Sequence, residues 1–193
     1  PLEKLQIKWY KGLLGVNRKA TNIAVLAELG KYPVAIDIAT NLIKYWLRIV
    51  NFDSSALIYE CYTDNVLLLQ GQNKCWLKAV REILYATGFH QVWLDQNTQD
   101  KTHLASDVRE KLEEIYQEQW KLDLWDDPRA DNSQGNKLRT YRRFKEEHKM
   151  ELYLTKVKDT KTRKDITRLR ISAHSLEIEK GRYLMKPIEE RKC

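Results

Sequence analysis

The sequence lacks the features that mark membrane-spanning and secreted proteins. No stretch approaches the roughly 18 to 20 continuous apolar residues that a spanning helix needs, and the N-terminal residues include neither an apolar signal-peptide region nor an initiating Met. Only three cysteines occur in 193 residues, an odd number that makes a poor disulfide framework. We therefore expect a reduced, intracellular protein that has no membrane partner.

The sequence also lacks the common catalytic motifs. It has no Ser-His-acid order, no HExxH and no phosphate-binding glycine loop. Gly12 and Gly15 come nearest to such a loop, but without its Gly-Lys-Ser/Thr ending they are expected to end the first helix. The only Asp-Asp pair, Asp126-Asp127, precedes Pro128, which argues against a flanking strand. We expect no catalytic residue in this segment.

The cysteines do not form a complete metal site. Cys61 and Cys75 have no second Cys or His at ligand spacing, so we expect buried or idle thiols. Cys193 is the final residue and follows Glu-Arg-Lys. A structural zinc site needs about four ligands, and this chain would supply one. We expect Cys193 to be the first ligand of a zinc motif that continues in a longer parent protein, and this segment itself to bind no cofactor.

Positive charge is concentrated toward the C-terminus. Residues 1–130 hold 16 Lys and Arg against 17 Asp and Glu, whereas residues 131–193 hold 18 against 10, a net of +8. Such an imbalance is typical of a protein with a polyanionic partner. The alternative is a solvated basic surface that has no partner.

Hydrophobic spacing predicts helices through most of the chain, and so a mainly α fold, an irregular helical bundle. Pro33 follows a Leu-Gly stop signal and can begin a helix, and further helices are expected over 74–87 and 104–125. Only residues 89–94 have β-like character. The Pro-, Gly- and Asp-containing stretch 126–136 is the best linker candidate. It would join a near-neutral helical body, 1–125, to a basic helical segment, 137–193, and the bundle could therefore have two lobes.

Two helices are expected in the basic segment, over 137–152 and 165–178. In the second, one stripe is predicted to be buried and consists of Ile166, Leu169, Ala173 and Leu176. A second stripe, on another face, consists of Arg163, Thr167, Arg170 and His174, with Lys164 and Arg168 beside it. Thr162 and Asp165 have capping-box spacing.

Arginines on these helices are the candidate nucleic-acid contacts. A guanidinium group can fork onto a phosphate and stack on a base, whereas we expect the interleaved Tyr141 and Phe144 to lie in the core. The residues predicted to contact the backbone of RNA or DNA are Arg139, Arg142, Arg143, Arg163, Lys164, Arg168 and Arg170. Binding through phosphates should weaken steeply as salt rises.

Three blocks of the sequence carry a family resemblance. They are KWYKGLLGVNRKATNIAVLAELGKYPVAIDI (8–38), KLRTYRRFKEEHKMELYL (137–154) and RLRISAHSLEIEKGRY…EERKC (168–193). In this order they resemble the C-terminal region of LINE-type non-LTR retrotransposon reverse transcriptases; the middle of the chain, about 51–136, matches only loosely. The resemblance implies a parent RNA-directed DNA polymerase that copies its own RNA at a nicked target, in the cytoplasm and nucleus.

The same resemblance implies that this region follows the polymerase and that a Cys/His zinc knuckle continues after Cys193. The polymerase aspartates would lie elsewhere in the parent. RNA, DNA and the rest of the parent protein are then the expected partners.

Two other functions remain open at this stage. The segment could be a helical scaffold that packs against the polymerase or another protein, in which case isolation would expose an apolar patch at Trp9, Trp46, Trp76 and Trp93. It could also be a degenerate element fragment that has no activity.

Overall fold

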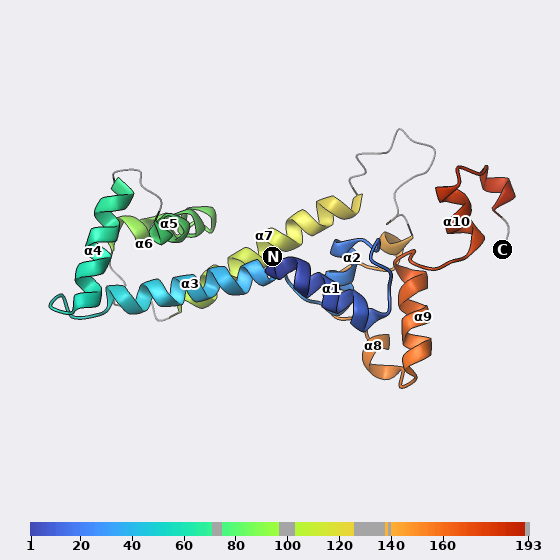
Figure 1. Cartoon of the computed structure of the whole chain (residues 1–193), viewed down its shortest axis with the longest axis horizontal. Helices are drawn as coiled ribbons and strands as arrows, with labels where there is room; N and C mark the ends of the chain where they lie inside the picture. The colour runs from blue at the N-terminus through green and yellow to red at the C-terminus, as the bar shows by residue number, and fades with distance from the viewer. Residues whose placement is uncertain (71–74, 97–102, 126–137, 139, 192–193) are drawn as a thin grey trace. The chain divides into compact units, whose positions relative to one another are not determined.

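The fold is mainly α, as the sequence predicts (Figure 1). The computed structural model describes residues 1–70, 75–96, 103–125, 138 and 140–191, and no strand occurs among them. Its α-helices are α1 Leu2–Leu14, α2 Asn22–Leu29, α3 Val34–Val50, α4 Leu57–Gln70, α5 Trp76–Ala86, α6 His90–Asp95, α7 Leu104–Trp125, α8 Tyr153–Lys156, α9 Thr160–Arg170 and α10 Glu177–Tyr183. Two 3₁₀ helices, η1 Tyr141–Arg143 and η2 Ile188–Glu190, complete the described elements.

The chain divides into two compact units. Unit 1 consists of residues 1–33 and 116–193, and unit 2 of residues 34–115. This division differs from the predicted one in that the first 33 residues belong with the C-terminal segment. The predicted linker, 126–136, lies outside the described residues.

Unit 2 has an apolar core. The side chains of Ile43, Leu77, Leu84 and Val108 are completely buried in it. Trp46 is also buried, and its indole N–H donates a hydrogen bond to the Tyr62 hydroxyl at 3.3 Å. The predictions of a helix from Pro33, a helix over 74–87 and a helix over 104–125 are confirmed by α3, α5 and α7.

The β-like character predicted for residues 89–94 is wrong. Gly88, at φ 83°, ends α5, and the chain then turns into α6, which buries Val92 in the core of unit 2. A strand also needs a partner, and the described residues include none. Instead, the segment forms the short helix α6 and buries one apolar side chain, that of Val92.

Unit 1 is built around α1, α2 and α9. Figure 1 shows α1 beside α2, and α1 also contacts α9. Gly15 ends α1 in the left-handed conformation (φ 67°), which confirms the prediction for this residue, whereas Gly12, also expected to end the helix, lies within α1. Gly30 ends α2 at φ 59°, and a Cβ there would overlap the backbone nitrogen of Met150. Glycine is therefore required at this position by both its dihedral angle and its neighbour.

The helix predicted over 137–152 does not form. Among the described residues of this range, only η1 is helical, and the backbone between η1 and α8 is irregular. The segment pairs with the end of α2 instead: the Glu151 N–H donates to the Glu28 carbonyl at 3.1 Å. Tyr141 is completely buried as predicted, but Phe144, predicted to lie in the core, is 56% exposed.

The helix predicted over 165–178 is also wrong in its bounds. Asp159 caps α9 by accepting a hydrogen bond from the Thr162 N–H at 2.6 Å, so the Thr162–Asp165 capping box does not form. The helix ends at Arg170, shortly before Ser172, whose φ of 52° interrupts the helical path. The chain becomes helical again in α10.

Candidate nucleic-acid interface

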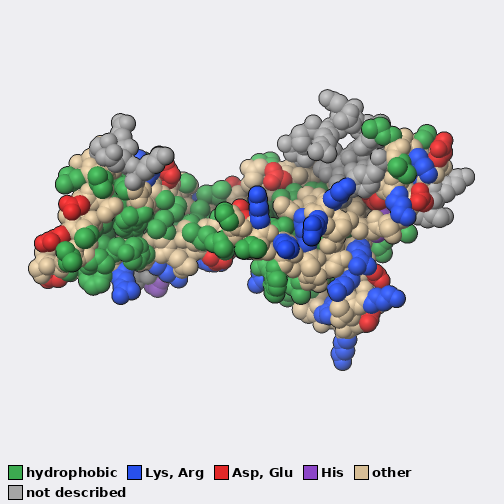
Figure 2. Space-filling view, viewed as in Figure 1, with side chains coloured by type: hydrophobic (Ala, Val, Ile, Leu, Met, Phe, Trp, Pro, Cys, Tyr) green, Lys and Arg blue, Asp and Glu red, His purple; other side chains and the backbone are tan. Residues whose placement is uncertain are grey.

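The two units differ in charge. Unit 1 contains 26 Lys and Arg against 16 Asp and Glu, a net of +10, whereas unit 2 contains 8 against 11, a net of −3. On the face in Figure 2, Lys and Arg side chains gather over α1, α8 and α9, and hydrophobic side chains predominate over unit 2. A polyanion would therefore be attracted to unit 1.

Some of the positive charge of unit 1 is used internally, around Glu28. This α2 residue is completely buried, and its Oε1 lies 2.7 Å from the Arg170 Nε. The same oxygen accepts a hydrogen bond of 2.7 Å from the Tyr153 hydroxyl. Burial alone would lower the pKa of Arg170, but its hydrogen bond to Glu28 and the charges of Glu28 and Glu151 outweigh burial and raise it.

A second carboxylate extends this ion cluster. Glu151 pairs with Arg170 at 2.9 Å and, through its other oxygen, with the Lys145 Nζ at 2.7 Å. Lys145 is 2% exposed and also donates to the Lys149 carbonyl. We name the set Glu28, Lys145, Glu151 and Arg170 the buried ion cluster. Because its members come from α2, α9 and the segment before α8, the cluster ties these three parts of unit 1 together.

Tyrosines adjoin the buried ion cluster. The Tyr153 hydroxyl lies 2.6 Å from the Thr167 hydroxyl, and the Thr167 hydroxyl donates to the Arg163 carbonyl at 2.9 Å. Tyr141 donates to the Ala24 carbonyl at 3.2 Å. Burial, followed by the nearby Glu28 carboxylate, raises the pKa values of Tyr141 and Tyr153. Both hydroxyls therefore stay protonated and can act as donors.

Arg170 does not lie where a phosphate contact needs it. Its side chain is 18% exposed and is held by two carboxylates, so its charge is balanced within unit 1, and the predicted contact with nucleic acid stays a prediction. The faces of α9 are partly exchanged relative to the prediction. Thr167, on the expected basic face, is completely buried, whereas on the expected apolar face Leu169 is 51% exposed and Ile166 is half-buried. Leu176, expected to be buried, is 45% exposed. The buried Glu28 carboxylate explains the exchange, because it requires a cation and a donor in the core.

Three other residues of α9 that were predicted to contact nucleic acid bond to, or pack against, neighbouring parts of unit 1. Arg163 donates to the Leu154 carbonyl at 3.1 Å and Arg168 to the Gly15 carbonyl at 2.8 Å. The aliphatic part of Lys164 lies over Gly15, where a Cβ would displace it. All three side chains are half-buried. Each fixes α9 to its neighbours while part of it still reaches solvent.

Of the remaining predicted residues, Arg142 is half-buried and Arg143 is exposed. The Arg142 guanidinium lies 4.7 Å from the centre of the Trp125 ring, a cation–π arrangement. Arg143 is exposed and forms no ion pair with another described residue. Arg139, also predicted to contact a phosphate, lies outside the described residues.

Several exposed cations of unit 1 are not among the predicted contacts. Lys156, Lys158 and Lys161 are exposed on and between α8 and α9. Two further exposed cations, Lys4 and Lys8, lie on α1. With the half-buried Lys11 they are spaced by four and three residues, so the three lysines share one side of the helix. That spacing is present in the sequence, but residues 1–130 as a whole are near-neutral, so their net charge does not indicate a basic surface on α1.

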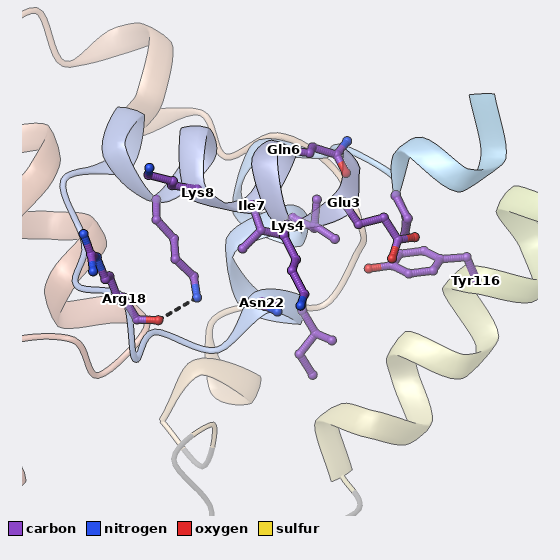
Figure 3. A pocket seen from close by; sticks show the side chains of 12 residues that line it. Glu3, Lys4, Gln6, Ile7, Lys8, Arg18, Asn22 and Tyr116 are labelled. Carbon is purple, nitrogen blue, oxygen red and sulfur yellow. Dashed lines mark hydrogen bonds between the residues drawn. The ribbon is translucent and has the colours of Figure 1, made fainter. Parts of the chain in front are cut away.

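The α1 lysines border a cleft of 640 Å³ in unit 1 (Figure 3). We name it the α1–α2 cleft; its lining residues are Glu3, Lys4, Gln6, Ile7, Lys8, Lys11, Arg18, Asn22, Ile23, Leu26, Pro33 and Tyr116. Figure 3 shows Lys8 and Arg18 toward one end and Glu3 and Tyr116 toward the other. The Lys11 Nζ donates to the Arg18 carbonyl at 2.9 Å and so holds the chain after α1 against this helix.

An aromatic cluster lies behind Tyr116. Its ring contacts the rings of Tyr32 and His148 edge-on, and His148 also meets Trp120 edge-on. The Tyr116 hydroxyl and both His148 ring nitrogens are buried and have no hydrogen-bond partner in the described part of the chain. Burial raises the pKa of Tyr116 to about 12. Burial, followed by the positive charge of Lys145, lowers the pKa of His148 to about 4. Both side chains are therefore neutral at pH 7.

Neither a metal site nor a spanning helix is found in the described ranges. Cys75 is half-buried, but Cys61 is exposed rather than buried. No group of three His, Cys, Asp or Glu that could hold a metal ion occurs among the residues that the structure describes. Cys193, the predicted zinc ligand, lies outside them. Of the described helices, none is both long and apolar enough to cross a membrane.

No protein-family model, curated protein or solved structure matches the chain. Function is therefore inferred from the charge and geometry of the described residues, and from the sequence resemblance.

Proposed function

We propose that this chain is a non-catalytic, nucleic-acid-binding segment of a LINE-type retrotransposon reverse transcriptase. Unit 1 would contact the phosphate backbone of template RNA or target DNA. Copying of RNA would belong to the polymerase of the parent protein, and Cys193 stays the predicted first ligand of a zinc motif there. The observation that carries the proposal is the net charge of +10 on unit 1 against −3 on unit 2.

Free cations on unit 1 support this proposal. Arg143, Lys156, Lys158 and Lys161 are exposed and form no ion pair within the described part of the chain. Each can therefore approach a phosphate without first breaking an internal contact. A protein that neutralises phosphates in this way releases condensed counterions, so its affinity falls as salt rises.

Fluorescence anisotropy with a labelled structured RNA, over a series of salt concentrations, tests the proposal. The triple variant Lys156→Gln, Lys158→Gln, Lys161→Gln should bind more weakly at every salt concentration. Its plot of log affinity against log salt should be shallower by roughly 0.7 to 0.9 for each lost phosphate contact. The matched control replaces three exposed cations of unit 2, through Lys44→Gln, Arg48→Gln and Lys78→Gln, and should bind like the wild type. Wild-type protein that does not bind at low salt, or binds independently of salt, would contradict the proposal.

A second candidate function is a scaffold that packs against the parent polymerase. Of the four tryptophans expected in an apolar patch, Trp46 is buried, Trp76 and Trp93 pack against the core of unit 2, and Trp9 is 67% exposed. On α1, Trp9 continues an exposed apolar stripe that consists of Leu2, Leu5, Trp9 and Leu13. Replacement of Leu5 and Trp9 by Gln would weaken docking to the polymerase under this second function, and would leave RNA affinity unchanged.

A further inference from the structure

The α1–α2 cleft combines an apolar lining with a cationic rim. Ile7, Ile23, Leu26 and Pro33 supply aliphatic surface, and Tyr116 supplies an aromatic wall. Lys4, Lys8, Lys11 and Arg18 supply the cations, against the single carboxylate of Glu3. A ligand that fits this lining carries negative charge at one end and a flat, mostly apolar body at the other.

The groups on the rim are available to a ligand. Lys4, Lys8 and Arg18 are exposed, and none of them forms an ion pair with a described residue. Asn22, the first residue of α2, is exposed at the cleft and offers both a donor and an acceptor.

The cleft is held in shape by contacts of its own. The bond from Lys11 to the Arg18 carbonyl and the left-handed turn at Gly15 fix the chain between α1 and α2. The edge-on contacts of Tyr116 with Tyr32 and His148 fix the aromatic wall. A preformed site avoids the entropic cost of ordering its side chains on binding.

An unpaired nucleotide matches this lining better than a duplex does. In a duplex the bases stay stacked inside the helix, so the apolar lining would have nothing to bury. A base that is not stacked can enter a pocket and contact aromatic surface, while its phosphates remain at the rim. The volume of 640 Å³ lies within the range of about 300 to 1,000 Å³ that is usual for small-ligand sites.

We infer that the α1–α2 cleft binds an unpaired nucleotide of an RNA or DNA strand, with its base against Tyr116 and the apolar lining and its phosphates at Lys4, Lys8 and Arg18. This inference rests on the proposed nucleic-acid binding, and adds that unpaired bases are the class of ligand that unit 1 prefers.

The test fills the cleft without removing charge. Asn22→Trp places a bulky side chain at the cleft, and Asn41→Trp, at an exposed position on α3 of unit 2, is the matched control. Three labelled probes of equal length are compared by anisotropy: an unstructured single strand, the same strand in a duplex, and a strand whose central positions are abasic. Circular dichroism and the unfolding midpoint establish that each variant is folded.

The wild type and Asn41→Trp should bind the single strand about tenfold more tightly than the abasic strand, because stacking of a base on an aromatic side chain contributes that order of affinity. Asn22→Trp should lose this difference and bind both strands like the abasic one, while its duplex affinity stays unchanged. If Asn22→Trp does not fold, the pair Lys4→Gln and Arg18→Gln should weaken single-strand binding more than duplex binding.

Two results would overturn the inference, and they differ in what else they overturn. Salt-dependent binding of all three probes, with no advantage for bases and no effect of Asn22→Trp, would exclude the cleft but keep unit 1 as a phosphate-binding surface. Absence of binding to every probe at low salt would contradict the proposed function and this inference together.

Discussion

Unit 1 and unit 2 are both helical, but they bury different kinds of groups. The core of unit 2 is apolar, and within it the Trp46 N–H donates to Tyr62, whose hydroxyl donates to Gln96 at 2.5 Å. Unit 1 holds two carboxylates and two cations in the buried ion cluster, of which Glu28 and Lys145 are buried and Glu151 and Arg170 half-buried. The difference shows that a count of basic residues overstates the surface open to a polyanion, because unit 1 uses Arg170 and Lys145 to balance its own carboxylates.

The largest effect is expected from breaking the buried ion cluster. Arg170→Met should destabilise unit 1 by about 4 kcal/mol, because it leaves a buried carboxylate without its cation. Region-resolved hydrogen exchange should show the loss of protection in unit 1, with unit 2 unaffected. Arg143→Met removes an exposed arginine and serves as the control. A stable Arg170→Met protein that has lost only RNA affinity would restore the original prediction of a phosphate contact at this position.

A deletion in the apolar core should have its effect in the other unit. Leu84→Ala removes a completely buried side chain of α5 and should cost unit 2 about 3 kcal/mol of unfolding free energy. Because no charge is involved, the cost should be the same at pH 7 and pH 5. Urea unfolding at both pH values measures it, with Leu67→Ala, at a 63% exposed position, as the control. A strong pH dependence would mean that the core of unit 2 is not apolar as described.

Acid should weaken unit 1 through His148. Its pKa is about 4 in the folded state and 6.5 in the unfolded chain, so between these pH values the unfolded state binds the proton more readily. The stabilising contribution of neutral His148 is therefore complete above pH 6.5 and is lost as the pH falls toward 4, by about 2 kcal/mol. The difference in unfolding free energy between the wild type and His148→Phe, measured at pH 7 and pH 4.5, isolates this residue. An unchanged difference would show that His148 is not buried within the aromatic cluster.

The smallest effect is expected on the outer face of α9. Leu169→Gln should change the free energy of unfolding by less than about 0.5 kcal/mol, because the side chain is half exposed. Thr167→Val, on the buried face, should cost more, because it leaves the Tyr153 hydroxyl without one of its partners. Thermal unfolding of both variants compares the two faces. The opposite ranking would restore the predicted orientation of α9.

The sequence predicts α3, α5 and α7 well, because their signals are local. The stop at Gly30 and the spacing of apolar residues in 74–87 and 104–125 depend on neighbours within a few turns, and α3, α5 and α7 follow them. The prediction of a helix over 137–152 is wrong for the opposite reason. Its helical spacing was overridden by contacts that are distant in sequence, above all the bond from Glu151 to the Glu28 carbonyl.

The candidate site could be predicted only in part, for the same reason. The charge of the C-terminal segment is plain in the sequence, but nothing local reveals that Glu28 is buried and that Arg170, 142 positions later, balances it. The α1–α2 cleft depends on Tyr116 lying near α1 and α2, although it is far from both in sequence. Long-range packing thus decides which cations face solvent, and the spacing of residues along the chain does not reveal which ones they are.

Lysine footprinting on the full chain, with and without bound RNA, tests most directly whether unit 1 is the nucleic-acid interface. Acetylation followed by mass spectrometry reports the reactivity of each lysine. Bound RNA should protect Lys4, Lys8, Lys156, Lys158 and Lys161 of unit 1 and leave Lys44 and Lys78 of unit 2 unchanged. Protection of the unit 2 lysines, or equal reactivity in both units at saturating RNA, would contradict the assignment.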